Sequence, residues 1–218
     1  IDCLQGNLLR ALVDLGCEDA RMDTAYEWMA RSVTGEGVAA KEDKDAEVRY
    51  YAYKCGPDFR CGANFGYPCA WGAVKVMLAF SALPAGRRTP LIERAIRRGT
   101  DFLFSEELTS AAWPGHRYVN PESKPVNAWT DNLPGTENYK PSSNWWKFGF
   151  PVFYVSDLLQ VAEALVRLGY GDDPRMAPLL QYIRGKADDT GRWALEYDYA
   201  GKTWGNYGEK RKPNKWVT

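Results

Sequence analysis

The chain has 218 residues, of which 28 are basic and 28 acidic, so its formal net charge is zero. Such a chain has no overall electrostatic attraction for nucleic acids or anionic membranes, and we expect no nucleic-acid partner. Hydrophobic residues make up 45% and aromatic residues 14%, enough for a folded domain. Because no apolar stretch approaches the ~20 residues of a membrane span, we expect a soluble protein without a transmembrane segment.

An internal repeat predicts helical hairpins. Residues 12–22 recur as residues 165–176 with one inserted residue. In both copies a glycine suits the left-handed position that ends a first helix, and an aspartate suits the start of a second helix. The glycines are Gly16 and Gly169, and the aspartates are Asp19 and Asp173.

A third hairpin lies between these two copies. Residues 73–80 are nearly all apolar, and after a Pro/Gly turn Thr89-Pro90 begins an amphipathic helix. A helix that is apolar on all sides must be covered, whereas an amphipathic helix can face water. This alternation predicts an all-α fold, an α/α toroid that is a partial barrel of helical hairpins, with inner apolar helices and outer amphipathic helices. We expect the inner helices to begin near Leu4, Trp71, Ser156 and Trp216.

Two long connections, residues 35–68 and 108–151, are rich in Gly, Pro, Tyr, Trp and Asn, and we expect irregular loops there. We interpret residues 1–218 as a single domain. The sequence begins without methionine and ends at Lys215-Trp216-Val217, which suggests the start of another helix. We therefore expect a fragment of a longer chain.

Two segments carry a family resemblance. Ala187-Asp188-Asp189-Thr190-Gly191-Arg192-Trp193 is similar to the end of the squalene-cyclase repeat, Gln-x-x-x-Gly-x-Trp, with Ala187 in place of Gln. Pro68-Cys69-Ala70-Trp71 is similar to the prenyltransferase segment in which a zinc-ligand Cys precedes an aromatic-rich inner helix. The chain thus resembles the terpenoid cyclase and protein prenyltransferase superfamily, and bacterial proteins with prenyltransferase and squalene oxidase repeats. The resemblance implies a toroid that binds, and in some members cyclises or transfers, an apolar isoprenoid ligand.

The chain also departs from that family. The protonating Asp-x-Asp-Asp motif of squalene-hopene cyclases is absent, and Tyr67 stands where prenyltransferases have a zinc-binding Asp. The zinc site of that family does not carry over, and the sequence leaves open whether the protein is an enzyme.

The N-terminal ends of the inner helices should meet at one mouth of the cavity. There Asp157 is either a helix cap or, in a poorly hydrated pocket, a catalytic proton donor. Aromatic faces could stabilise a carbocation, and polar side chains from the first helix could contact the ligand. These ligand-binding candidates are Trp71, Tyr154, Trp145, Trp146, Gln5 and Asn7.

Four of the five cysteines are candidate metal ligands. Cys55, Cys61 and Cys69 have a looser spacing than common zinc knuckles, and Cys3 at an equivalent helix start could complete four thiolates around a zinc ion. A Cys55–Cys61 disulfide and buried thiols without metal are the alternatives. The odd number of cysteines favours a reducing compartment, so we expect a cytoplasmic location.

Two rival functions follow from other features. A carbohydrate lyase or hydrolase would use an open groove lined by Trp129, Trp145 and Trp146, because indoles stack on sugar rings. A non-catalytic scaffold module would hold a structural metal with its cysteines and bind a partner protein on its concave face.

Overall fold

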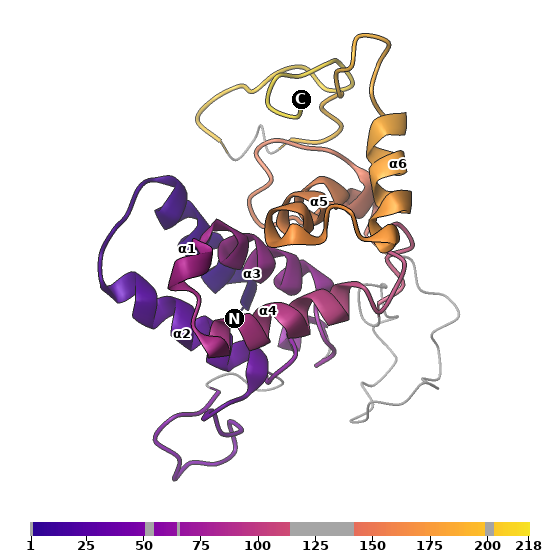
Figure 1. The fold of residues 1–218 in the computed structure, drawn as a ribbon. Coiled ribbons are helices and arrows are strands. Elements are labelled where there is room, and N and C mark those ends of the chain that lie inside the picture. Colours follow the sequence, from indigo (N-terminus) through magenta and orange to yellow (C-terminus); the bar gives the residue numbers. More distant parts are fainter. Residues whose placement is uncertain (1, 51–54, 65, 114–141, 199–202) are drawn as a thin grey trace.

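The computed structural model describes residues 2–50, 55–64, 66–113, 142–198 and 203–218 (Figure 1). These residues form helices joined by irregular segments and contain isolated β-bridges but no strand, which confirms the all-α prediction. The helices are α1 (Asp2–Asp14), α2 (Arg21–Thr34), α3 (Ala70–Ala82), α4 (Pro90–Leu103), α5 (Leu158–Leu165) and α6 (Ala177–Gly185). Short 3-10 turns span Gly62–Asn64, Ala85–Arg87, Ser143–Trp146 and Pro174–Met176, and a π-turn spans Val166–Tyr170.

The predicted hairpin signals act as expected. Gly16 and Gly169 have φ angles of 76° and 92°, in the left-handed region that glycine adopts without strain. The Thr89 hydroxyl caps α4 by accepting a hydrogen bond from the backbone N–H of Ile92 at 3.3 Å. Asp19 lies one residue before the cap position of α2, yet its carboxylate still accepts the N–H of Arg21 at 2.8 Å.

The first helices of the hairpins are neighbours. α3 lies between α1 and α5 and packs most extensively against α1, while α2 packs against α4 and α6 against α5 (Figure 1). Residues Ala70–Phe80 of α3 are all buried except Trp71, whereas α4 exposes one face. The predicted alternation therefore holds for α3 and α4, whereas α1, also expected to be a covered inner helix, leaves Leu4 and Leu8 more than half exposed.

The contact between α1 and α3 depends on a glycine. A Cβ atom on Gly6 would lie 2.4 Å from the carbonyl carbon of Lys75 and 2.6 Å from the backbone nitrogen of Val76. Real Cβ atoms do not approach backbone that closely, so α1 and α3 can touch here only because residue 6 lacks a side chain. This contact positions the first turn of α1 next to the first turn of α3.

Near Trp216, where we expected another inner helix to begin, the last described residues form a turn. One helical turn is present, in which the N–H of Thr218 donates to the carbonyl of Asn214 at 3.0 Å. The Trp216 ring stacks on Phe150 with centroids 5.0 Å apart. In the segment that resembles the squalene-cyclase repeat, the Trp193 indole donates to the carbonyl of Ile183 at 2.7 Å and ties that segment to α6.

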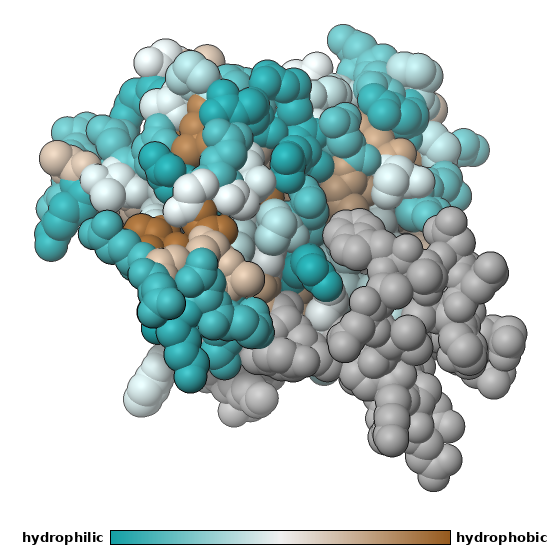
Figure 2. Space-filling view, turned by 90° about the horizontal axis from the view of Figure 1, so that it is seen from below, coloured by the Kyte–Doolittle hydropathy of each residue, from teal (hydrophilic) through white to brown (hydrophobic). Residues whose placement is uncertain are grey.

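None of the helices in the described part of the chain combines the length and apolarity needed to cross a bilayer. In the face drawn in Figure 2, hydrophilic side chains predominate and smaller hydrophobic patches lie between them.

Candidate functional site

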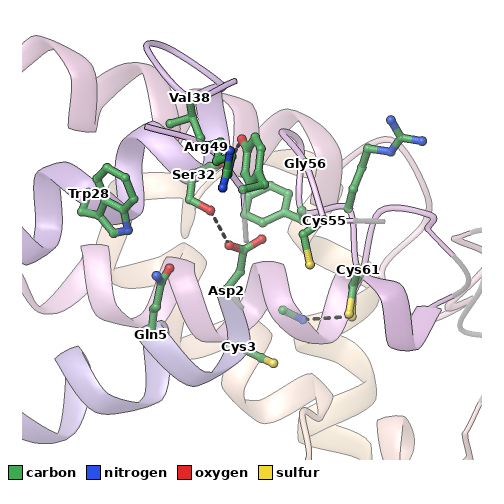
Figure 3. A pocket seen from close by; sticks show the side chains of 15 residues that line it. Asp2, Cys3, Gln5, Trp28, Ser32, Val38, Arg49, Cys55, Gly56 and Cys61 are labelled. Carbon is green, nitrogen blue, oxygen red and sulfur yellow. Dashed lines mark hydrogen bonds between the residues drawn. The ribbon is translucent and has the colours of Figure 1, made fainter. Parts of the chain in front are cut away.

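Four cysteines line one cavity, which we call the thiol pocket (Figure 3). The pocket encloses about 50 Å³ between the start of α1, the second half of α2, the start of α3 and the irregular segments that contain residues 38–50 and 55–61. Its sulfur-bearing residues are Cys3, Cys55, Cys61 and Cys69. These are the four cysteines that the sequence grouped as candidate ligands, while Cys17 lies in the turn after α1 and outside the lining.

Local structure explains how two of these thiols come together. Cys69 is the N-cap of α3, and its Sγ accepts a hydrogen bond from the backbone N–H of Gly72 at 3.3 Å. Arg60 and Pro68 form an antiparallel bridge. Around it the N–H of Cys61 donates to Tyr67 at 3.1 Å and the N–H of Cys69 donates to Phe59 at 2.9 Å. This register places Cys61 and Cys69 on one face as diagonal neighbours.

Two thiols of the pocket, those of Cys3 and Cys69, hold their protons more tightly than a free cysteine does. Burial raises the pKa of Cys3, although its Sγ lies 3.2 Å from the hydroxyl of Tyr154 in a hydrogen bond. The pKa of Cys69 lies well above its usual range because the thiol shares a hydrogen bond with Cys61 and is buried. The pKa of Tyr154 is also raised, mainly by its hydrogen bond to Cys3. A bound cation would have to displace these protons.

A carboxylate and an amide complete the pocket. The Oδ1 atom of Asp2 accepts a hydrogen bond from the Ser32 hydroxyl at 2.9 Å, and burial raises the pKa of Asp2. The Tyr50 hydroxyl donates to the Ser32 carbonyl at 2.7 Å, which fixes α2 against the following segment. The Oε1 atom of Gln5 is buried without a hydrogen-bond partner among the described residues. An unpartnered acceptor in a cavity suits a water molecule or a ligand that donates a hydrogen bond.

Asp157 occupies the position of a helix cap. It is 1% exposed, caps α5 through the N–H of Gln160 at 3.0 Å, and does not line the thiol pocket. Burial raises the pKa of Asp157 to about 6. The Lys75 amine, 2% exposed, donates to Oε1 of Gln160 at 2.5 Å, and burial lowers the pKa of Lys75 to about 8. The two groups form a buried polar network between α3 and α5.

The predicted aromatic candidates lie in different places. Tyr154 reaches Cys3 but is 54% exposed, and Trp71 is half-buried in the first turn of α3. The indoles of Trp145 and Trp146 donate to the carbonyls of Leu108 and Thr109 at 2.9 and 2.7 Å. They tie two loop segments together outside the thiol pocket.

The remaining candidates divide between described and undescribed parts of the chain. Gln5 lines the thiol pocket, whereas Asn7 is half-buried on α1 and is not part of the lining. Trp129, the third indole of the predicted sugar groove, lies outside the described residues.

The chemistry of the thiol pocket is that of soft ligands. Thiolates select zinc, copper(I) and similar ions over hard cations such as magnesium. With the side chains as they stand, no three His, Cys, Asp or Glu residues of the described ranges are arranged to hold a metal ion. A volume of about 50 Å³ is far below the ~300 Å³ minimum of typical small-molecule sites.

Sequence reasoning identified the thiols but missed Asp2, Ser32 and Tyr50. Asp2 precedes Cys3 and could have been found by its position in the first turn of α1. Ser32 is a polar residue of α2, a helix that the sequence identifies only through its apolar residues. Tyr50 lies in an irregular segment, where residue spacing does not predict which way a side chain points. Their convergence depends on how α2 and that segment fold over α1.

No protein-family model matches the chain, and the searches of curated proteins and of solved structures found no match.

Proposed function

We propose that this domain binds a thiophilic metal ion of the zinc type in the thiol pocket, with Cys3, Cys55, Cys61 and Cys69 as ligands. The observation that supports the proposal is that four of the five cysteines, three from one irregular segment and Cys3 from the first turn of α1, line one small cavity. Four thiolates are a complete tetrahedral ligand set for zinc. The fifth, Cys17, lies outside the lining and provides a natural control.

The size and setting of the pocket favour a metal ion. A cavity of about 50 Å³ has room for an ion and a water molecule, and the unpartnered Oε1 of Gln5 could accept a hydrogen bond from such a water. A metal ion would replace the thiol protons as the positive charge that stabilises the sulfurs. It would join the first turns of α1 and α3 to segment 55–69, so we assign it a structural role.

Metal titration of the reduced protein tests this proposal. Cobalt(II) bound by thiolates gives charge-transfer bands and tetrahedral d–d bands, and zinc should displace it because zinc prefers tetrahedral thiolate sites. We expect one ion per chain for the natural protein and for Cys17→Ser. Cys61→Ser and Cys69→Ser should each weaken binding strongly, since each removes a ligand.

Binding should also depend on pH, because the raised pKa values of Cys3 and Cys69 make the protons harder to displace at low pH. Cobalt spectra without thiolate bands, or binding lost equally in Cys17→Ser and Cys61→Ser, would contradict a site in the thiol pocket.

A second candidate function is binding of an apolar, isoprenoid ligand in the hollow of a toroid. A row of exposed leucines along α1 favours it. The row consists of Leu4, Leu8 and Leu12 of α1 and of Leu15 in the turn that follows it, which are 52%, 55%, 40% and 84% exposed. Their spacing of four, four and three residues places them on one side of the helix.

A fluorescent farnesyl analogue tests this second candidate. Its emission should increase on binding to the natural protein and to Trp204→Glu, which alters an exposed side chain away from α1. The signal should be lost in Leu8→Glu. Equal signals for the two variants would exclude the leucine row as the binding surface.

A further inference from the structure

Two thiols of the pocket are already paired. Cys69 shares a hydrogen bond with Cys61, and each residue follows one member of the antiparallel bridge between Arg60 and Pro68. Cys3 has a different partner, the Tyr154 hydroxyl at 3.2 Å. Although four sulfurs line the cavity, Cys61 and Cys69 thus form a distinct pair within it.

We propose that Cys61 and Cys69 form a reversible disulfide when the protein meets a hydroperoxide, and that this bond is a redox switch of the thiol pocket. The disulfide itself follows from the geometry of the pair. Its effect on metal occupancy rests on the proposed function, because two of the four proposed ligands would be consumed.

The backbone favours this pairing. The hydrogen bonds on either side of the bridge hold the two residues as diagonal neighbours on one face, with their sulfurs within hydrogen-bond reach. Cys61, the sulfur that attacks, belongs to a partly exposed residue, so a small peroxide can reach it. The connecting segment contains Gly62 and Gly66, the latter at a φ of 85°, and it can adjust as the sulfurs approach bonding distance.

The pair also suits the chemistry of thiol oxidation. The reaction requires only that one of the two neighbouring thiols loses its proton to solvent, and we write it with Cys61 as the attacking sulfur. The Cys61 thiolate attacks one oxygen of the peroxide, which forms an S–O bond, breaks the O–O bond and releases hydroxide or alkoxide.

The Cys69 sulfur then attacks Cys61 as its proton leaves, forming the S–S bond and expelling the sulfenic oxygen as water. Overall, two thiols lose two electrons and two protons, and hydrogen peroxide is reduced to two molecules of water.

The experiment uses metal-free, fully reduced protein treated with one equivalent of hydrogen peroxide. Remaining thiols are alkylated, and the mass of the intact chain and of non-reduced peptides is measured. We expect the alkylated thiols to fall from five to three, with a disulfide between the peptides of Cys61 and Cys69. Dithiothreitol should restore all five.

Matched variants locate the bond. Cys17→Ser and Cys55→Ser should keep the disulfide, whereas Cys61→Ser and Cys69→Ser should abolish it. Disulfides that involve Cys3 or Cys55 instead, bonds between chains, or a Cys61–Cys69 pair that is oxidised no faster than Cys17 would each overturn the proposal.

A second arm separates the switch from the metal site. Zinc-loaded protein is oxidised in the presence of a chromogenic chelator, and we expect zinc release to parallel disulfide formation. Disulfide formation in a protein that never bound zinc would support the thiol pair and refute the metal function. Zinc binding without a Cys61–Cys69 disulfide would refute the switch and leave the metal function standing.

Discussion

The close approach of α1 to α3 at Gly6 makes Gly6→Ala a sharp test of how α1 positions the thiol pocket. The new Cβ would lie 2.4 to 2.6 Å from three backbone atoms of Lys75 and Val76. These atoms belong to the interior of α3 and cannot rotate away as a side chain could. We therefore expect α1 to shift away from α3 and to carry Cys3 and Gln5 with it.

The expected magnitude follows from two opposing effects. Alanine is favoured over glycine in a helix interior by roughly 0.5–1 kcal/mol. Overpacking of a tight contact typically costs about 1–3 kcal/mol, and a clash with backbone belongs at the upper end. The net loss should be about 2 kcal/mol, which corresponds to a decrease in Tm of about 4–8 °C for a domain of this size.

Gly185→Ala is the matched control, because Gly185 ends α6 and its added Cβ would meet nothing within 4 Å. Thermal and urea unfolding, followed by circular dichroism, should show Gly6→Ala less stable and Gly185→Ala equal to or more stable than the natural protein. Cobalt binding should also weaken in Gly6→Ala. If Gly6→Ala were as stable as Gly185→Ala, the close α1–α3 contact would be refuted.

Three further predictions concern buried polar groups, each checked by the free energy of unfolding. The pKa of Lys75 is lowered from 10.5 to about 8, so between these values the unfolded chain binds more protons than the folded protein. The free energy of unfolding should therefore rise by about 3 kcal/mol as pH increases across that window. Lys75→Met should flatten this rise, and an unchanged pH profile in the variant would contradict the prediction. The pKa of Asp157 is raised from 3.8 to about 6, so between these values the folded protein binds more protons than the unfolded chain. The free energy of unfolding should therefore fall by about 3 kcal/mol as pH rises through that window. Asp157→Asn, which can still cap α5, should remove this fall. Tyr26→Phe should cost about 1 kcal/mol because the buried Tyr26 hydroxyl donates to the Ala79 carbonyl at 3.0 Å; no loss in urea unfolding would contradict that.

Much of the helical framework could be predicted from local signals. The repeat around Gly16 and Gly169 and the Thr89-Pro90 start mark hairpins because each signal acts on the backbone of its own turn. The apolar circumference of residues 73–80 likewise requires a covered helix, and α3 is that helix. Local chemistry does not decide whether the hairpins close into a ring.

The residues of the candidate site could likewise be predicted only in part. Grouping Cys3, Cys55, Cys61 and Cys69 by helix register agrees with their common cavity, whereas the aromatic candidates do not share it. Trp145 and Trp146 have the composition of a ligand-binding loop, but their indoles donate to the Leu108 and Thr109 carbonyls. Composition alone cannot tell an indole that binds a ligand from one that satisfies a distant carbonyl.

By itself, the sequence determined where most helices form and that α3 must be covered, because propensity, caps and apolar periodicity act within a few residues. Tertiary structure decided the pairing of Cys61 with Cys69, the approach of Gly6 to Lys75 and the burial of Asp157 beside Lys75. These contacts join residues whose distance is set by how helices and loops pack. Packing depends on the shape of the whole interior, which no local pattern in the chain encodes.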